Sequence, residues 1–210
     1  MTEIFRLFHL GLNLDYEEEY KQIGYTNFTQ SMALEPGTLA MYGCHLPEDY
    51  SQQIVVERYA NEEAYQKHIQ SSHFKTFVGL AQKALTSREV VTLVPQLLHQ
   101  KPTALQIFDD DQLAVRLATV TVSDNNAFSE IVLPEMQTSM EKEEGVLVMY
   151  AGIDVDNPGI WYFFEVYQNE AAYEQHRETP HFKDYIERSA KLVLDKQLQT
   201  LHGDMLVNRG

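Results

Sequence analysis

Residues 57–68 read ERYANEEAYQKH, and residues 165–176 read EVYQNEAAYEQH, 108 positions later. After four intervening residues, each of these segments is followed by the tripeptide His-Phe-Lys, at 73–75 and at 181–183. Seven of the first twelve positions and all three positions of the tripeptide are identical, and the alignment needs no gap. A match of this density at a fixed offset indicates an internal duplication.

A second pair of segments extends the match toward the N-terminus of each copy. Residues 35–42 (EPGTLAMY) and 143–150 (EEGVLVMY) share five residues at the same offset. Because the offset holds without a gap, we interpret the chain as two copies of one unit, residues 1–98 and 104–210. The copies are expected to join between Pro95 and Thr103, where polar residues interrupt the hydrophobic periodicity.

The composition excludes several classes of function. The chain has 210 residues, with 31 Asp+Glu against 16 Lys+Arg and a net charge of −15, which disfavours binding to nucleic acid or to an anionic membrane. It has no apolar run of about 18 residues, so no membrane span is expected. The first residues lack the apolar core of a secretory signal, and the single cysteine, Cys44, precludes an intrachain disulfide. A cytoplasmic location is therefore expected.

Each copy shows the pattern strand, long helix, strand, strand, helix pair, strand. A period of two in the apolar residues indicates the first strand, and Asp15 followed by Glu18 is typical of a helix start. Asn61 and Asn169 stand where an N-cap is expected, before the helix that carries the repeated Ala, Tyr and His. The expected strands include 8–14, 39–46, 53–59, 90–94, 115–122 and 198–201.

This order of elements is that of a ferredoxin-like α+β unit, an antiparallel sheet with helices on one face. The other face of each sheet must also be covered, and two copies in one chain can cover each other. The sequence therefore predicts two ferredoxin-like units in tandem that form an intramolecular pseudo-dimeric α+β barrel. We expect a monomer with this internal pseudo-dimer, and further association of whole chains is left open.

A carboxylate recurs within an aromatic row on the third strand of each copy. Glu57 shares a strand face with Tyr59, and Glu165 shares one with Tyr167 and Trp161. Desolvation there would raise the glutamate pKa toward a value that suits general acid or base catalysis. The alternative is a structural glutamate that fixes the following loop by hydrogen bonds, since both kinds of network perturb a pKa.

Two histidines recur after that strand in each copy. His73 and His181 lie near the start of a helix, where the helix dipole disfavours the protonated ring, so they are candidates for a general base or a donor to substrate. His68 and His176 lie on the preceding helix and are candidates for substrate binding. The alternative is that these rings cap backbone groups and position the helices.

Other chemistry finds little support in the sequence. A metal site of Glu57, His68 and His73 is disfavoured by the spacing of the two histidines, so we expect no metal. The chain has no P-loop and no G-x-G-x-x-G motif, so no nucleotide cofactor is expected. Asn13 lies on the first strand and is replaced by Thr121 in the second copy, which confines any role in binding to the first half.

The pattern from Glu165 to Lys183, with its weaker copy from 57 to 75, resembles the signature of the antibiotic biosynthesis monooxygenase family. The resemblance implies a pocket between sheet and helices in each unit. It also implies oxidation of electron-rich aromatic molecules by O₂ without metal or organic cofactor. Carried over by position, Glu57 or Glu165 with His73 or His181 would be base and orienter, and Tyr59, Tyr167 and Trp161 would line the pocket.

The sequence also departs from part of that family. The haem-degrading members place an iron-ligating histidine where this chain has Val78 and Ile186, which disfavours haem degradation. We therefore expect a cofactor-independent monooxygenase that acts on a small quinol-like or polyphenolic molecule. The alternatives are an isomerase or other proton-transfer enzyme of the same fold, and a non-catalytic protein that binds a small ligand.

The two pockets are expected to differ in size. Trp161 and Phe163 occupy the positions that Gln53 and Val55 occupy in the first copy, and the first pair is much bulkier. The sequence therefore predicts that the pocket of the first copy is the more open one.

Overall fold

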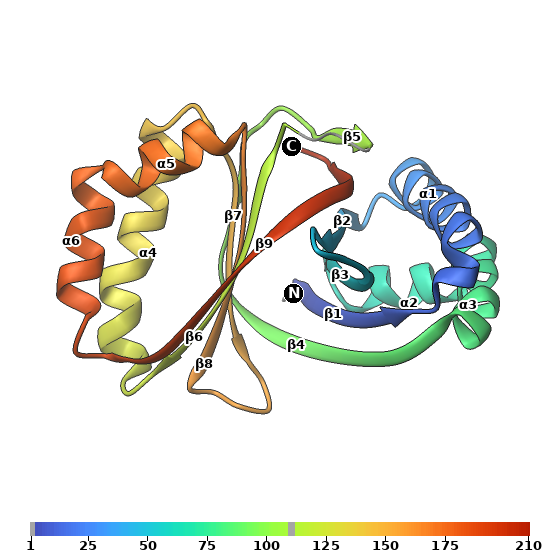
Figure 1. The fold of residues 1–210 in the computed structure, drawn as a ribbon, viewed down its shortest axis with the longest axis horizontal. Helices are drawn as coiled ribbons and strands as arrows, with labels where there is room; N and C mark the ends of the chain where they lie inside the picture. Colours follow the sequence, from blue (N-terminus) through green and yellow to red (C-terminus); the bar gives the residue numbers. More distant parts are fainter. Residues whose placement is uncertain (1–2, 109–111) are drawn as a thin grey trace. The chain divides into compact units, whose positions relative to one another are not determined.

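The computed structural model describes residues 3–108 and 112–210 (Figure 1). The strands are β1 (Ile4–Leu12), β2 (Thr38–Leu46), β3 (Asp49–Tyr59), β4 (Leu85–Gln100), β5 (Gln106–Phe108), β6 (Ala114–Val122), β7 (Val146–Asp154), β8 (Ile160–Tyr167) and β9 (Val193–Asn208). The helices are a short 3-10 helix (Leu14–Tyr16), α1 (Glu17–Leu34), α2 (Glu62–Gln70), α3 (Ser72–Ala84), α4 (Asn125–Lys142), α5 (Glu170–Glu178) and α6 (Pro180–Ser189).

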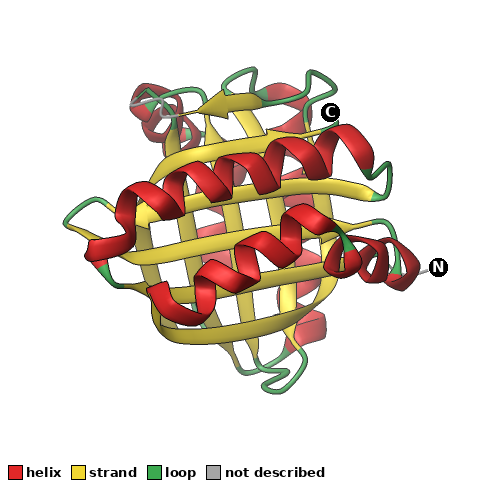
Figure 2. Cartoon of the chain, turned by 90° about the vertical axis from the view of Figure 1, so that its right-hand side faces the viewer, coloured by secondary structure: helices red, strands yellow, loops and turns green. Residues whose placement is uncertain are grey.

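The chain packs into two compact units. Unit 1 comprises Met1–Thr92, Thr103–Asp110 and Gly203–Gly210, and unit 2 comprises Leu93–Pro102 and Asp111–His202. Each unit is an antiparallel sheet with its helices on one face, as Figure 2 shows for α1 and α3 of unit 1. The order of elements is βαββαβ in both, so the prediction of two ferredoxin-like α+β units in tandem is confirmed.

Within each sheet the strands pair in corresponding ways. In unit 1, β1 pairs with β3 and with the first part of β4, and β2 pairs with the other edge of β3. In unit 2, β8 lies between β6 and β7, and the first part of β9 pairs with β6. The second part of β4 pairs with β7 and so belongs to unit 2. The last residues of β9 pair with β5 and belong to unit 1.

The break predicted between Pro95 and Thr103 is wrong over its first half, because β4 continues to Gln100. The register with β7 shifts between Pro95 and Leu97, so the ladder accommodates a proline that has no N–H to donate. The closing strands are correspondingly longer than the predicted 90–94 and 198–201. Each packed unit therefore contains a strand segment that the division of the sequence at 98 and 104 assigns to the other copy.

Side-chain caps fix where the short helices begin. The Asn61 side chain accepts a hydrogen bond from the backbone N–H of Ala64 at 2.9 Å, and Asn169 does the same for Ala172 at 2.9 Å. The predicted cap at Asp15 is wrong. Asn13 takes that role instead, because its Oδ1 accepts from the N–H of Asp15 at 3.1 Å and the chain makes a 3-10 turn before α1.

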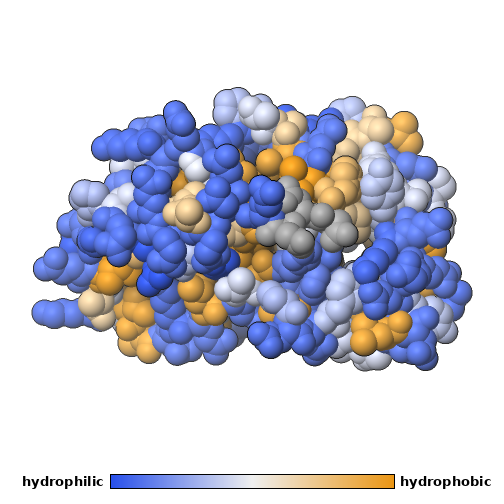
Figure 3. Space-filling view, turned by 45° about the horizontal axis from the view of Figure 1, so that its top comes forward, coloured by the Kyte–Doolittle hydropathy of each residue, from blue (hydrophilic) through white to orange (hydrophobic). Residues whose placement is uncertain are grey.

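The surface follows from the composition. The face drawn in Figure 3 is mostly hydrophilic, in keeping with an acid-rich chain. None of the helices that the structure describes has the length and apolar character that crossing a membrane requires.

A close approach between the turn before β2 and helix α2 recurs in both units. A Cβ added at Gly37 would lie 2.4 Å from the Cβ of Ala64, and one added at Gly145 would lie 2.6 Å from that of Ala172. We therefore expect Gly37→Ala and Gly145→Ala each to lower the free energy of unfolding by about 1 to 3 kcal/mol, because the backbones must separate. Urea denaturation of the purified variants measures this loss.

Gly79 provides the control for this prediction. A Cβ there meets no atom within 4 Å, and the residue lies inside α3. Gly79→Ala is expected to raise stability by up to about 1 kcal/mol, since alanine favours a helix. Equal effects of all three substitutions would contradict the steric explanation.

Candidate functional site

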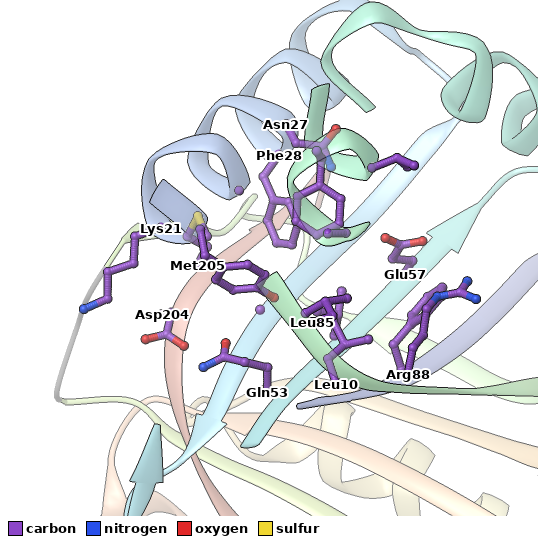
Figure 4. Close-up of a pocket in the computed structure, with 18 of the residues that line it drawn as sticks. Leu10, Lys21, Asn27, Phe28, Gln53, Glu57, Leu85, Arg88, Asp204 and Met205 are labelled. Atoms are coloured by element: carbon purple, nitrogen blue, oxygen red, sulfur yellow. The ribbon is translucent and has the colours of Figure 1, made fainter. Parts of the chain in front are cut away.

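Unit 1 encloses a cavity of about 600 Å³ between its sheet and helices α1 and α3. Most of its wall is apolar, and aromatic rings form much of it. Figure 4 shows Leu10, Phe28, Leu85 and Met205 around the middle of the cavity. Concave sites of this size with few polar groups are typical of binding sites for small organic molecules. The aromatic residues of the wall are Phe8, Tyr20, Phe28, Tyr50, Tyr65, Phe74 and Phe77.

A buried carboxylate marks one end of this cavity. Glu57 projects from β3 with 8% of its surface exposed, and its Oε2 accepts a hydrogen bond from the hydroxyl of Tyr59 at 2.9 Å. Burial raises the pKa of Glu57, although His68, the Tyr59 hydrogen bond, Arg6 and Arg88 act in the opposite direction. Burial also raises the pKa of Tyr59, so this residue remains a phenol that donates to the carboxylate.

Asn27 lies on α1 at the same end and is 3% exposed. Its Oδ1 is buried and has no hydrogen-bond partner among the described residues, so it is available to accept a hydrogen bond from a hydroxyl in the cavity. Asn27 and Arg88 were not predicted from the sequence. A usable signal existed for Asn27, because the equivalent position in the second copy is the charged residue Glu135.

The opposite end of the cavity is also polar. Figure 4 shows Lys21, Gln53 and Asp204 there, away from Glu57 and Arg88. Asp204 lies in the last part of β9 and pairs with the imidazole of His45 at 2.9 Å. Residues near the C-terminus thus complete a cavity whose other walls come from the first half of the chain.

The two predicted histidines of unit 1 meet at a third residue, Glu35. Its Oε2 lies 3.0 Å from Nδ1 of His68, and its Oε1 lies 2.6 Å from Nε2 of His73. Thr38 donates a further hydrogen bond to Glu35 at 2.7 Å. Neither histidine lines the cavity, but the ring of His68 packs against that of Tyr59 with centroids 5.3 Å apart. His68 therefore lies outside the cavity wall, packs against Tyr59 and, through Tyr59, helps to position Glu57.

Unit 2 repeats the glutamate–histidine contacts, without the bond from Thr38, because valine stands at the equivalent position 146. Oε1 of Glu143 lies 3.1 Å from Nδ1 of His176 and 2.7 Å from Nε2 of His181. The hydroxyl of Tyr167 donates to Glu165 at 2.8 Å. Glu35 and Glu143 were missed as partners of the histidines, although both stand in the repeated segments 35–42 and 143–150.

The equivalent cavity of unit 2 has a volume of only about 40 Å³. Trp161 stacks on Phe163 with their rings 5.9 Å apart, and its indole N–H donates to Asn125 at 2.8 Å. Both rings are buried in the core of the unit. The prediction that the first pocket is the more open one is therefore confirmed, and Trp161 fills space rather than lining an open pocket.

Glycines help to keep the cavity of unit 1 open. A Cβ at Gly24 would lie 3.3 Å from Met205, and one at Gly43 would lie 3.4 Å from the ring of Phe28. Valine and alanine occupy these positions in unit 2. A surface hollow of about 520 Å³ remains there, outside the filled core and beside Phe182.

The remaining predicted residue, Asn13, is not part of the cavity wall. Its side chain caps the 3-10 helix as described above. The structure thus brings Glu57, Tyr59, His68 and His73 into one connected group around Glu35 and leaves Asn13 outside it.

Nitrogen and oxygen atoms of Glu35, His68 and His73 lie within 4.8 Å of one another, as do those of Glu135, His176 and His181. Ligands of a tetrahedral Zn²⁺ with bonds of about 2.0 to 2.1 Å stand about 3.3 Å apart. The separation of 2.6 Å between His73 and Glu35 is shorter and fits a direct hydrogen bond. Unit 1 therefore presents a hydrogen-bonded cluster. Binding of a metal would require His73 and Glu35 to move apart.

Comparison with known proteins agrees with this architecture. Residues 8–80 and 114–188 match the family described as antibiotic biosynthesis monooxygenase. No curated protein shows significant similarity to the chain. A "putative monooxygenase" from Lactobacillus acidophilus NCFM has 34% sequence identity and a TM-score of 0.90, with 100% of this chain and 98% of that chain covered.

Two further structures share the fold. A "putative monooxygenase" from Fusobacterium nucleatum has 24% identity and a TM-score of 0.89, with 100% of this chain and 95% of that chain covered. An "anthrone oxidase-like protein" has 12% identity and a TM-score of 0.57, with 99% and 94% covered. At these identities the similarity concerns the fold alone.

Glu135, which replaces Asn27 in unit 2, leads to a prediction about pH. Burial raises its pKa from 4.5 to about 6, against the effects of His176 and of a 2.8 Å hydrogen bond from Ser139. The folded state then binds more protons than the unfolded state between pH 4.5 and 6, so this residue lowers stability as the pH rises. Between pH 4.5 and pH 7, the free energy of unfolding of Glu135→Gln is expected to rise by about 2 kcal/mol relative to that of the wild type.

Urea denaturation at several pH values measures this difference. Glu130→Gln, an exposed change on the same helix, is the control and is expected to follow the wild type. If Glu135→Gln also follows the wild type at every pH, Glu135 does not carry the raised pKa.

Proposed function

Because the chain belongs to the antibiotic biosynthesis monooxygenase family, we propose that its unit 1 cavity binds a small quinol-like or polyphenolic molecule and promotes its oxidation by O₂ without metal or organic cofactor. The observation that carries this proposal is a cavity of about 600 Å³ with aromatic walls and a buried carboxylate at one end. Such a site can hold a flat ring and ionise one of its hydroxyls.

In this proposal Glu57 is the base. A quinol that enters the cavity with one hydroxyl toward Glu57 gives up that proton, and the resulting anion is electron-rich enough to reduce O₂. The raised pKa of Glu57 supports this role, because a carboxylate that binds protons more tightly takes one from a phenol more readily. The unpartnered Oδ1 of Asn27 would accept a hydrogen bond from the second hydroxyl of the substrate.

The overall reaction balances without another reductant. One oxygen atom of O₂ forms a bond to a ring carbon, and the other leaves as water with two hydrogens that come from the quinol. The quinol supplies all four electrons and becomes a hydroxyquinone. What the protein contributes is the dry apolar cavity, the removal of the proton and donors that hold the anion.

His73 and His68 would act as positioning residues. They hold Glu35, and through His68 they support Tyr59 and the carboxylate of Glu57. The same cluster is present in unit 2, where the cavity is filled, so its presence does not depend on a ligand. Glu57 lines the cavity and the two histidines do not, which supports Glu57 as the group that meets the substrate.

We also infer that this reaction takes place in a reducing compartment such as the cytoplasm. The one cysteine, Cys44, is free and buried, and it takes part in no disulfide.

Oxygen uptake by metal-free protein, with a panel of hydroquinones and anthrones in the presence of chelator, tests the proposal. We expect uptake by the wild type and a loss of at least about 100-fold in Glu57→Gln, because general base catalysis contributes factors of this order. Glu165→Gln is the matched control, since it makes the same change in the closed unit, and should keep the wild-type rate.

Other results would assign the cavity differently. Equal loss in both variants would mean that the glutamates act through stability rather than as a base. Turnover of a substrate without oxygen uptake would identify an isomerase or another proton-transfer enzyme. Binding without any turnover would identify a protein that only holds a small ligand.

A further inference from the structure

Two arginines flank the buried carboxylate of unit 1. Arg6 in β1 is the direct cross-strand partner of Glu57 in β3, so the two side chains share one face of the sheet. Arg88 comes from β4, the other neighbour of β1, and Figure 4 shows it beside Glu57 at the wall of the cavity. Glu57 and Arg88 therefore line the cavity together, and Arg6 lies next to Glu57 across the strand pair.

Neither guanidinium is neutralised by a salt bridge. Among residues 3–108 and 112–210, no carboxylate lies within ion-pair distance of Arg6 or Arg88, and Nε of Arg6 is buried without a hydrogen-bond partner. By contrast, Arg58 on the same strand as Glu57 pairs with Glu3 at 2.7 Å.

The equivalent arginine of unit 2, where the cavity is filled, allows a direct comparison. Arg6 stacks on the ring of Tyr65 at 4.0 Å, and Arg116 stacks on the equivalent Tyr173 at 4.1 Å. Arg116, however, also binds the carboxylate of Glu170 at 2.5 Å. In unit 1 the equivalent of Glu170 is Glu62, which accepts a hydrogen bond from Gln66 instead, so Arg6 keeps its charge without a carboxylate partner among the described residues.

We propose that the cavity of unit 1 binds an aromatic carboxylic acid. Its carboxylate group binds to Arg88 at the cavity wall, and the nearby charge of Arg6 adds to the attraction. A planar guanidinium matches a carboxylate with two parallel hydrogen bonds, and its charge is retained at all physiological pH values. The ring would lie in the apolar middle of the cavity. This inference rests on the proposed function, because it specifies the substrate class of the same site.

The position of the arginines also fixes which part of the substrate reacts. Arg88 and Glu57 line the same cavity and the charge of Arg88 acts on Glu57, so a carboxylate bound to Arg88 would bring a hydroxyl on the neighbouring ring carbon toward Glu57. The raised pKa of Glu57 is consistent with this arrangement, since the arginines only partly offset its burial. An ortho-hydroxylated aromatic acid is therefore the expected ligand.

A matched pair of probes tests this proposal, namely 1,4-dihydroxy-2-naphthoic acid and 1,4-dihydroxynaphthalene, which differ in one carboxylate. Calorimetric titration under anaerobic conditions measures the two affinities without oxidation. We expect the wild type to bind the acid about tenfold or more tightly than the neutral diol. In Arg88→Gln this preference should disappear, because only the acid has a carboxylate that the guanidinium would bind.

Lys196→Gln is the control, because Lys196 is the equivalent of Arg88 in unit 2 and should leave both affinities unchanged. Arg88 is exposed, so its replacement is expected to leave the fold intact, which circular dichroism checks. Equal affinities of the wild type for the two probes would overturn the carboxylate proposal and leave the proposed function standing. Failure of both probes to bind would count against the carboxylate proposal and against the proposed function.

Discussion

One carboxylate that bridges two imidazoles organises each unit of this protein. In unit 1, Glu35 at the end of α1 binds His68 of α2 and His73 of α3, and Glu143 does the same for His176 and His181 in unit 2. These charge-assisted hydrogen bonds connect the long helix to the helix pair and hold both against the sheet. The space between sheet and helices, in which any ligand must lie, depends on this connection.

Both units share these glutamate–histidine contacts, so the size of a few side chains decides which unit has a cavity. Gln53 and Val55 leave room where Trp161 and Phe163 fill it. Duplication thus allowed one unit to keep an open site while the other gained a continuous aromatic core. The filled unit serves as an internal comparison, because a feature confined to unit 1, such as Asn27, is a candidate for function.

Much of the fold could be predicted from the sequence, and less of the site. Local signals such as the N-cap at Asn61 and the period-two strands are short-range, and the repeat made each of them visible twice. The extension of β4 past Pro95 could not be predicted, because a bulge in β4 itself, between Pro95 and Leu97, accommodates the proline. Glu35 and Arg88 were missed because their contacts join segments that only tertiary packing brings together. The burial of Glu57 could be predicted, because its neighbours on the strand determine its surroundings.

The central claim is that only unit 1 has an internal cavity, between its sheet and helices, with room for a ligand. Calorimetric titration of the whole chain with 1,4-dihydroxynaphthalene under anaerobic conditions tests it most directly, because the stoichiometry counts the open sites. The cavities of about 600 and 40 Å³ predict one molecule bound per chain. Two molecules bound with similar affinity would contradict the account, since both units would then have to open.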